Sequence, residues 1–190
     1  MISFPLLLLL ICDFLAIGLL PILFFRRDGQ INLRWLATSA PFFIVPAALL
    51  LGQAAVLDPS YQAHGEVLTA LQVAAVLLSV TSIALIAMTV GTHRIPLALW
   101  HQDNDAPMEL VTWGPYRSIR HPFYTSFLLA FAAAVLAFPH AITVGCLIYA
   151  AVVLTVTARR EERRLANSEL GEKYREYMTV AGRFFPRKTS

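Results

Sequence analysis

Long apolar segments, separated by short polar ones, make up most of this chain. Residues 1–25 contain one charged residue, Asp13, while residues 35–57 and residues 67–90 contain none. Each run exceeds the roughly 18 apolar residues that indicate a membrane-spanning helix, since about 20 residues cross a hydrocarbon core of about 30 Å. The pattern therefore predicts three transmembrane helices in the first half of the chain.

Two shorter apolar runs follow, residues 123–138 and residues 141–158, with Pro139 and His140 between them. Either run alone could form a buried helix of a soluble protein. Because they follow three spans and are joined by only two residues, they predict a helical hairpin that crosses the membrane and returns. The chain is therefore expected to be an all-α polytopic membrane protein with five transmembrane helices, the last two forming this hairpin.

The distribution of basic residues supports this number of spans. With five spans, residues 26–34, 91–122 and 159–190 lie on the same side of the membrane. These segments contain three, three and nine of the fifteen Lys and Arg residues, so the opposite side receives none. Cytoplasmic loops carry the excess of Lys and Arg in membrane proteins. We therefore predict an outer N-terminus and a cytoplasmic C-terminus.

Composition and charge exclude several classes of protein. Charged residues form 14% of the chain, against roughly 25% in ordinary soluble domains. The net charge of +3 is explained by the cytoplasmic excess of Lys and Arg, so we expect no nucleic-acid partner. Cys12 and Cys146 both lie within predicted spans, which argues against a disulfide or a cysteine metal cluster. The histidines lack the H-x-x-x-H spacing of a metal site, and we expect no metal.

Polar residues concentrate first in residues 92–124, ahead of the predicted hairpin. Gly114 and Pro115 predict a turn, and Pro122 stands where the next helix begins, a position at which proline is well tolerated. The first N–H groups of that helix then point towards the loop, with the positive end of the helix dipole behind them. This arrangement can receive a carboxylate or another anion. The alternative is a membrane-interface anchor, with Arg and Tyr side chains at the depth of the lipid headgroups.

The second polar region follows the fifth predicted span. Glu161 and Glu162 come directly after that span, where the positive-inside rule favours only cations. Ion pairs with arginines three residues away can explain both acids as part of a solvated helix. They do not explain Tyr174, Tyr177 or the aromatic segment 184–186. We therefore expect the C-terminal segment to fold back against another part of the protein.

Three stretches of these regions resemble the isoprenylcysteine carboxyl methyltransferase family, integral-membrane enzymes that use S-adenosyl-L-methionine. They read LVTWGPYRSIRHPFYTS at residues 110–126, EERRL at 161–165 and GEKYREYMTVAGRFFP at 171–186. They fit the family patterns L-V-T-x-G-x-Y-x-x-x-R-H-P-x-Y, E-E-x-x-L and G-x-x-Y-x-x-Y. The resemblance covers the C-terminal half, while the first three spans agree only in being hydrophobic. It suggests one of the smaller, prokaryotic-type members, in the plasma or inner membrane.

The resemblance implies a division into a three-helix transmembrane part, residues 1–91, and a cofactor-binding catalytic part, residues 92–190. S-adenosyl-L-methionine would lie between the cytoplasmic loop, the start of the fourth helix and the C-terminal segment. Cofactor contacts implied by the matching positions are His101, Met108, Glu109, Leu110, Val111, Tyr116, His121, Pro122, Phe123, Tyr124 and Glu161, where Gln102 is an alternative to His101. The residues expected to carry the chemistry are Arg160, Glu161 and Glu162.

One departure from the family bears on the methyl acceptor. The carboxyl-methylating enzymes have an arginine four residues before the first acid of E-E-x-x-L, where this chain has Thr157. A hydroxyl cannot replace the paired hydrogen bonds of a guanidinium to a carboxylate, and Arg160 alone approaches the same helix face, at a different depth. We therefore expect an amphipathic small-molecule or lipid acceptor other than a prenylcysteine carboxylate. The alternative functions are a sterol-reductase-like enzyme that uses NADPH and a non-catalytic membrane protein with a degenerate site.

Asp13 stands inside the first apolar run, where an ionisable residue is costly and suggests a function by default. We place it towards the outer half of its helix, away from both polar regions. A packing hydrogen bond or a protonated carboxyl is therefore the favoured interpretation, and a direct role in the chemistry is the alternative.

Overall fold

The computed structural model describes residues 2–18, 31, 33–92 and 110–187. Within these residues the chain is helical, and the extended backbone is limited to isolated bridges. The elements are α1 (Phe4–Gly18), α2 (Leu33–Gln53), α3 (Gly65–Thr92), the 3₁₀ turn η1 (Gly114–Arg117), α4 (Pro122–Ala137), α5 (Ala141–Ala166) and α6 (Gly171–Val180). The predicted all-α class is confirmed, and each of the first five helices overlaps one predicted apolar run.

Two helices are long and apolar enough to cross a membrane, α3 with 28 residues and α5 with 26. Shorter apolar helices cover Phe4–Ile17, Ala37–Gln53 and Pro122–Ala137. The apolar part of α5 ends at Ala158 and a charged stretch, residues 159–164, follows it. We therefore place the last two turns of α5 beyond the hydrocarbon region. The count of five spans remains a prediction.

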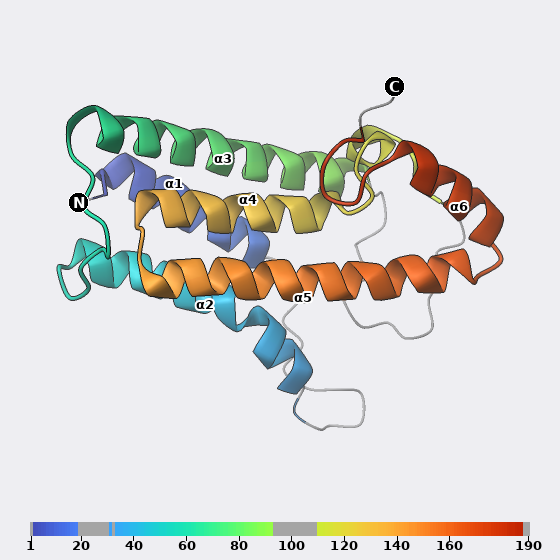
Figure 1. The fold of residues 1–190 in the computed structure, drawn as a ribbon, viewed down its shortest axis with the longest axis horizontal. Helices are drawn as coiled ribbons and strands as arrows, with labels where there is room; N and C mark the ends of the chain where they lie inside the picture. The colour runs from blue at the N-terminus through green and yellow to red at the C-terminus, as the bar shows by residue number, and fades with distance from the viewer. Residues whose placement is uncertain (1, 19–30, 32, 93–109, 188–190) are drawn as a thin grey trace.

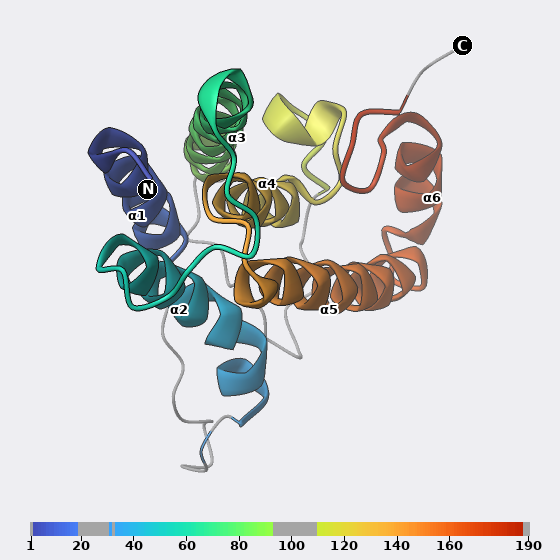
Figure 2. The ribbon, with the colours of Figure 1, turned by 60° about the vertical axis from the view of Figure 1, so that its left-hand side comes forward.

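Helix α4 is the centre of the bundle. It runs beside α3 and α5, and α1 and α2 also contact it (Figures 1 and 2). Six consecutive residues, 122–127, are buried, as are Ala130, Phe131, Ala133 and Ala134, so side chains on several faces of α4 pack against other helices. By contrast, α3 and α5 each carry large apolar side chains on an exposed face. Such faces suit contact with lipid, which leaves α4 as the interior helix.

Aromatic packing and small residues fix α4 in this position. The ring of Phe14 meets the ring of Phe131 edge-on at 5.3 Å, and Phe42 meets Phe127 edge-on at 5.2 Å. Between these rings the alanines of α4 let neighbouring helices approach closely, as small residues do in membrane bundles. The helices α1 and α2 are thereby held against the same helix whose first turn begins the polar end of the molecule.

The turn between α4 and α5 confirms that these two helices form a hairpin, while its crossing of the membrane stays a prediction. His140 caps α5, because its Nδ1 accepts the N–H of Ile142 at 3.1 Å and the hydroxyl of Thr143 accepts the N–H of His140 at 3.2 Å. The hydroxyl of Thr143 is also 2.8 Å from the carbonyl of Phe138. Reciprocal capping of this kind satisfies N–H groups that a helix start leaves open, so two residues suffice to reverse the chain.

Candidate functional site

The charged end of the bundle brings together η1, the start of α4, the end of α5 and the segment after α6 (Figure 1). Gly114 opens η1 with a φ of +59°, and a Cβ there would lie 2.4 Å from the hydroxyl oxygen of Thr92. The turn predicted at Gly114 and Pro115 is therefore confirmed, and it requires glycine both for its backbone conformation and for its approach to α3. This turn brings the following residues, 118–121, to the end of the bundle.

The segment after α6 pairs with residues 118–121. The N–H of Arg120 donates to the carbonyl of Gly182 at 2.8 Å, and the N–H of His121 donates to the carbonyl of Arg183 at 3.1 Å. The N–H of Gly182 returns a hydrogen bond to the carbonyl of Ser118 at 3.0 Å. The expectation that the C-terminal segment folds back against another part of the protein is confirmed. Its partner is the loop directly before α4.

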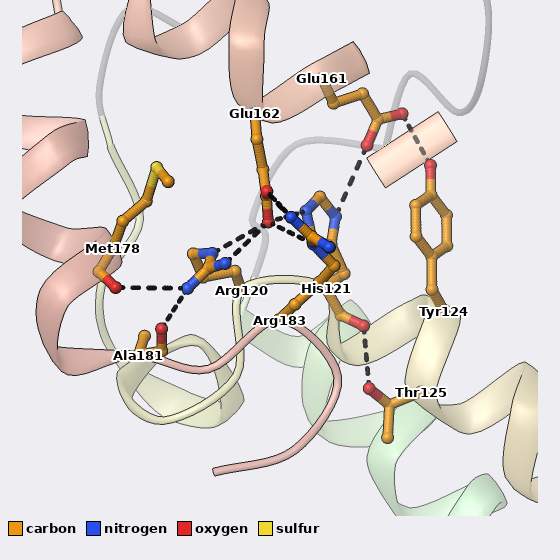
Figure 3. A network of polar contacts seen from close by, with 9 residues as sticks. All are labelled: Arg120, His121, Tyr124, Thr125, Glu161, Glu162, Met178, Ala181 and Arg183. Carbon is orange, nitrogen blue, oxygen red and sulfur yellow. Dashed lines mark hydrogen bonds and ion pairs between the residues drawn. The ribbon is translucent and has the colours of Figure 1, made fainter. Parts of the chain in front are cut away.

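Glu162 is the centre of a buried ion-pair cluster (Figure 3). Its Oε1 lies 3.0 Å from both Nε and Nη2 of Arg120, and its Oε2 lies 2.5 Å from Nη2 of Arg183. Nε2 of His121 lies 3.3 Å from Oε1, without the alignment of a hydrogen bond. Only 5% of the Glu162 side chain is exposed. One carboxylate therefore joins α5 to the loop and to the C-terminal segment.

This cluster keeps Glu162 ionised despite its burial. Burial alone would raise the pKa of Glu162, but the contacts with His121, Arg183 and Arg120 outweigh it, so the pKa lies well below its ordinary value of 4.5. Arg120 also donates to the backbone carbonyls of Met178 and Ala181. The guanidinium thereby satisfies helix-end carbonyls of α6 as well as the carboxylate. Glu162 serves to hold segments together and has little capacity left for a ligand.

Glu161 has a different environment, although it is the adjacent residue. Its Oε1 accepts the phenol of Tyr124 at 2.6 Å, and its Oε2 lies 3.5 Å from Nδ1 of His121. Its side chain is 38% exposed, against 5% for Glu162. Burial raises the pKa of Glu161, and the hydrogen bond from Tyr124 opposes that rise. Of the two acids, Glu161 is the one that can bind a further group.

Aromatic side chains surround Glu161 on the α4 side. The rings of His121 and Tyr124 are stacked, with centroids 5.2 Å apart and planes 3° from parallel, and Phe184 meets His121 edge-on at 6.2 Å. The hydroxyl of Thr125 donates to the carbonyl of Phe184 at 2.8 Å, which fixes the C-terminal segment beside α4. The result is a half-buried carboxyl flanked by flat, polarisable surfaces at a helix start.

The remaining predicted site residues have varied positions. Pro122 and Phe123 are buried at the base of α4, and Phe123 packs on Phe127 at 6.1 Å. The backbone carbonyl of Tyr116 accepts the phenol of Tyr177, and burial raises the pKa of Tyr116. Leu110 and Val111 are half-buried, and Leu110 packs against the cluster of Tyr174 and Tyr177. Three predicted contacts lie outside the described residues: His101, Met108 and Glu109.

Arg160 differs from the two acids that follow it, because it is exposed and on another face of α5. In the described part of the chain it forms no ion pair with Glu161 or Glu162. The residues that sequence reasoning missed are Arg120 and Arg183, which neutralise Glu162. Arg120 stands next to His121 within the motif that resembles the family. The place of Arg120 in this motif is the sequence feature from which its role could have been inferred.

The family model for phospholipid methyltransferases matches residues 61–173, from the segment ahead of α3 to the first turn of α6. The chain belongs to this family. Because the family includes the isoprenylcysteine carboxyl methyltransferases, the resemblance of the motifs is confirmed. Comparisons with curated proteins and with solved structures gave no match.

Membership in the phospholipid methyltransferase family identifies the protein as an integral membrane methyltransferase that acts on lipid-like substrates. The matched residues include α4 and both acids of α5, whereas Arg183 and Phe184 lie beyond them. The C-terminal segment is therefore joined to the family region through Glu162 and the backbone pairing with residues 118–121.

The first prediction concerns Glu162. Glu162→Gln removes the charge that Arg120 and Arg183 share, and breaking a buried ion pair on one side costs about 3 kcal/mol. We expect a lower thermal midpoint in detergent than for Glu172→Gln, a matched change at an exposed acid of α6. Equal midpoints for the two variants would contradict the proposed role of the cluster.

The pH dependence of stability gives a second measurement on the same variants. Since the pKa of Glu162 is lower in the folded protein than its ordinary 4.5, its contribution is present above pH 4.5 and decreases as the pH falls below that value. Wild type and Glu172→Gln should both lose stability through this window. Glu162→Gln should show a smaller decrease, because the titrating carboxyl is absent.

Proposed function

We propose that this protein transfers a methyl group from S-adenosyl-L-methionine to an amphipathic acceptor at the cytoplasmic surface of the membrane. The observation that carries the proposal is the half-exposed carboxyl of Glu161, bonded to Tyr124 at the start of α4, in a member of a methyltransferase family. An acid that is only solvated on a helix surface does not need a hydrogen bond from a buried phenol, as Glu161 has from Tyr124. The adjacent acid, Glu162, already accounts for the structural ion pairs.

The chemistry of these residues fits S-adenosyl-L-methionine. The carboxyl of Glu161 can accept hydrogen bonds from an ammonium group or from ribose hydroxyls, and the rings of His121, Tyr124 and Phe184 offer surfaces for an adenine. The start of α4 provides the positive end of a helix dipole for a carboxylate. Further contacts are proposed for residues matched by the resemblance: His101, Met108, Glu109, Leu110, Val111, Tyr116, Pro122 and Phe123.

The bound cofactor supplies an electrophilic methyl group, and the residues of the chain position it and exclude water. Positioning two reactants beside each other removes much of the entropic barrier to a bimolecular step. Glu162 fixes the loop and the C-terminal segment, and thereby His121 and Phe184. For an amine, thiol or phenol acceptor, Glu161 is the nearest candidate to receive a proton, since its raised pKa suits a general base better than that of an ordinary Glu.

The natural acceptor is proposed to be a membrane-soluble small molecule or a lipid headgroup other than a prenylcysteine carboxylate. Thr157 is half-buried one helical turn before Glu161, where a carboxylate acceptor would require a guanidinium. Arg160 is exposed on another face of α5, which supports a contact with an anionic headgroup near the membrane surface better than a contact beside Glu161. Five spans would bring this site to the cytoplasmic side, beside the lipid headgroups.

Binding of S-adenosylhomocysteine to the detergent-solubilised protein tests the site. We expect Tyr124→Phe, Glu161→Gln and His121→Ala each to weaken binding roughly ten- to a hundredfold, since a hydrogen bond to a charged group contributes about 1.5–3 kcal/mol. His140→Ala, which alters the cap of α5 at the other end, should leave the affinity unchanged. The measurement is isothermal titration calorimetry.

The same calorimetry separates the alternatives. Unchanged affinity in both Glu161→Gln and His121→Ala would remove these residues from the site. Binding of NADPH in place of S-adenosylhomocysteine would favour a reductase, and binding of neither would favour a non-catalytic protein.

A second test addresses the acceptor. Wild type should methylate a farnesyl-cysteine analogue poorly, and Thr157→Arg should methylate it roughly tenfold faster, because the new guanidinium can pair with the substrate carboxylate. Methyl transfer from radiolabelled S-adenosyl-L-methionine measures both rates, and Thr157→Gln serves as the uncharged control. Efficient methylation by wild type, lost in Arg160→Ala, would show instead that Arg160 binds the carboxylate.

A third test addresses topology. We expect reporter fusions at residue 60 to be external and fusions at residues 30, 105 and 190 to be internal, because only this arrangement places every Lys and Arg on one side. Paired reporters that are active on opposite sides of the membrane provide the control at each position. An external signal at residue 105 would contradict a cytoplasmic site.

A further inference from the structure

A second polar cluster lies inside the bundle beside the first turns of α4, whereas the sequence placed Asp13 away from both polar regions. Asp13 of α1 is fully buried. Its Oδ2 accepts the hydroxyl of Ser79 at 2.8 Å, and its Oδ1 lies 2.8 Å from the hydroxyl oxygen of Ser82. The two serines are three residues apart and therefore share one face of α3. None of the ion pairs in the described part of the chain involves Asp13.

The hydrogen-bond geometry of Ser82 shows how many protons this cluster needs. Its hydroxyl oxygen lies 2.8 Å from Oδ1 of Asp13 and 2.9 Å from the backbone carbonyl oxygen of Ser126 in α4. A serine hydroxyl carries one proton and can donate only once. If Asp13 were ionised, the single proton of Ser82 would have to serve both acceptor oxygens.

A proton on Oδ1 of Asp13 satisfies every contact. Asp13 then donates to Ser82, Ser82 donates to the carbonyl of Ser126, and Ser79 donates to Oδ2 of Asp13. Neither α3 nor α4 has a cation that could compensate a charge here, because α4 contains no charged residue and the only charged residue of α3 is Glu66 in its first turn. An unpaired carboxylate within the hydrocarbon region would be costly.

We propose that Asp13 is a neutral, protonated acid that fixes the first turns of α4 and is thereby a positioning residue for the cytoplasmic site. The chain of hydrogen bonds runs from α1 through Ser82 to Ser126, one turn after Pro122. The hydroxyl of Ser126 donates in turn to the carbonyl of Phe123 at 2.7 Å. Phe123 stands between the two residues that approach Glu161, His121 and Tyr124. Asp13 is thus connected to the site end of α4 through the hydrogen bonds of Ser82 and Ser126.

Infrared spectroscopy tests the protonation. The difference spectrum between wild type and Asp13→Asn at neutral pH should contain the carbonyl absorption of a protonated carboxyl in the wild type. Asp13→Asn should keep a thermal midpoint close to that of wild type, because its amide donates to Ser82 and accepts from Ser79 as the neutral acid does. Asp13→Ala, which does neither, should have a clearly lower midpoint.

Three outcomes would overturn the protonation. The first is the absence of that absorption in the wild type. The second is an Asp13→Asn variant as unstable as Asp13→Ala. The third is a wild-type midpoint that rises with Na⁺ but not with choline, since five oxygen atoms around an ionised Asp13 would then bind a cation in place of the proton.

Ser82→Ala and Ser79→Ala form a matched pair that tests positioning. Both remove one hydrogen bond to Asp13, but only Ser82→Ala cuts the connection to α4. In hydrogen–deuterium exchange, Ser82→Ala should raise exchange in residues 122–128 roughly fivefold, the change expected for one lost hydrogen bond. Ser79→Ala should leave that segment unchanged. Equal exchange in the two variants would overturn the positioning role.

The affinity for S-adenosylhomocysteine adds a readout that rests on the proposed function. It should fall in Ser82→Ala and stay constant in Ser79→Ala, even where their thermal midpoints agree. If wild type does not bind the ligand, the proposed function fails, while the infrared and exchange measurements still decide the role of Asp13.

Discussion

The polar end of this protein depends on one buried carboxylate. Glu162 is surrounded by Arg120 and His121 from the loop before α4 and by Arg183 from the segment after α6. Neither residues 118–121 nor residues 181–187 lie within a helix that could hold them in place. A buried, ionised carboxylate requires several donors at once, and satisfying it draws these segments together. Backbone pairing between residues 118–121 and 182–183 then fixes their register.

The requirement to neutralise Glu162 gives the two adjacent glutamates, Glu161 and Glu162, different roles. Both carboxylate oxygens of Glu162 accept hydrogen bonds from guanidinium groups, which hold its pKa below the ordinary value. Glu161 is the preceding residue and faces Tyr124, with a more exposed side chain and a raised pKa. One helix can direct the two acids towards different neighbours, because the side chains of adjacent residues point about 100° apart. The structural acid thus positions the segments around the acid that is proposed to bind the cofactor.

Hydropathy predicted the helices well because lipid requires helical backbone wherever the chain is apolar. It predicted the end of the fifth run at residue 158, whereas α5 continues to Ala166, since charged residues with good helix propensity extend it beyond the apolar segment. The candidate site was predicted less completely. His121, Tyr124 and Glu161 came from motifs, but Arg120 and Arg183 bind Glu162 across 42 and 21 residues of sequence. Pairing of this kind depends on tertiary packing, which no local pattern records.

The position of α4 explains why the polar groups in its first turns have partners inside the protein. A central helix cannot reach water along its sides, so each polar group that contacts it must find a partner inside the protein. At the site end the partners are Glu161 and the C-terminal segment, and deeper in the bundle they are Ser82 and Asp13. Both sets act on residues 121–126, the beginning of one rigid helix. A methyl acceptor that enters from the lipid would therefore meet a site whose geometry is set on one side by Glu162 and its arginines and on the other by hydrogen bonds in the interior of the bundle.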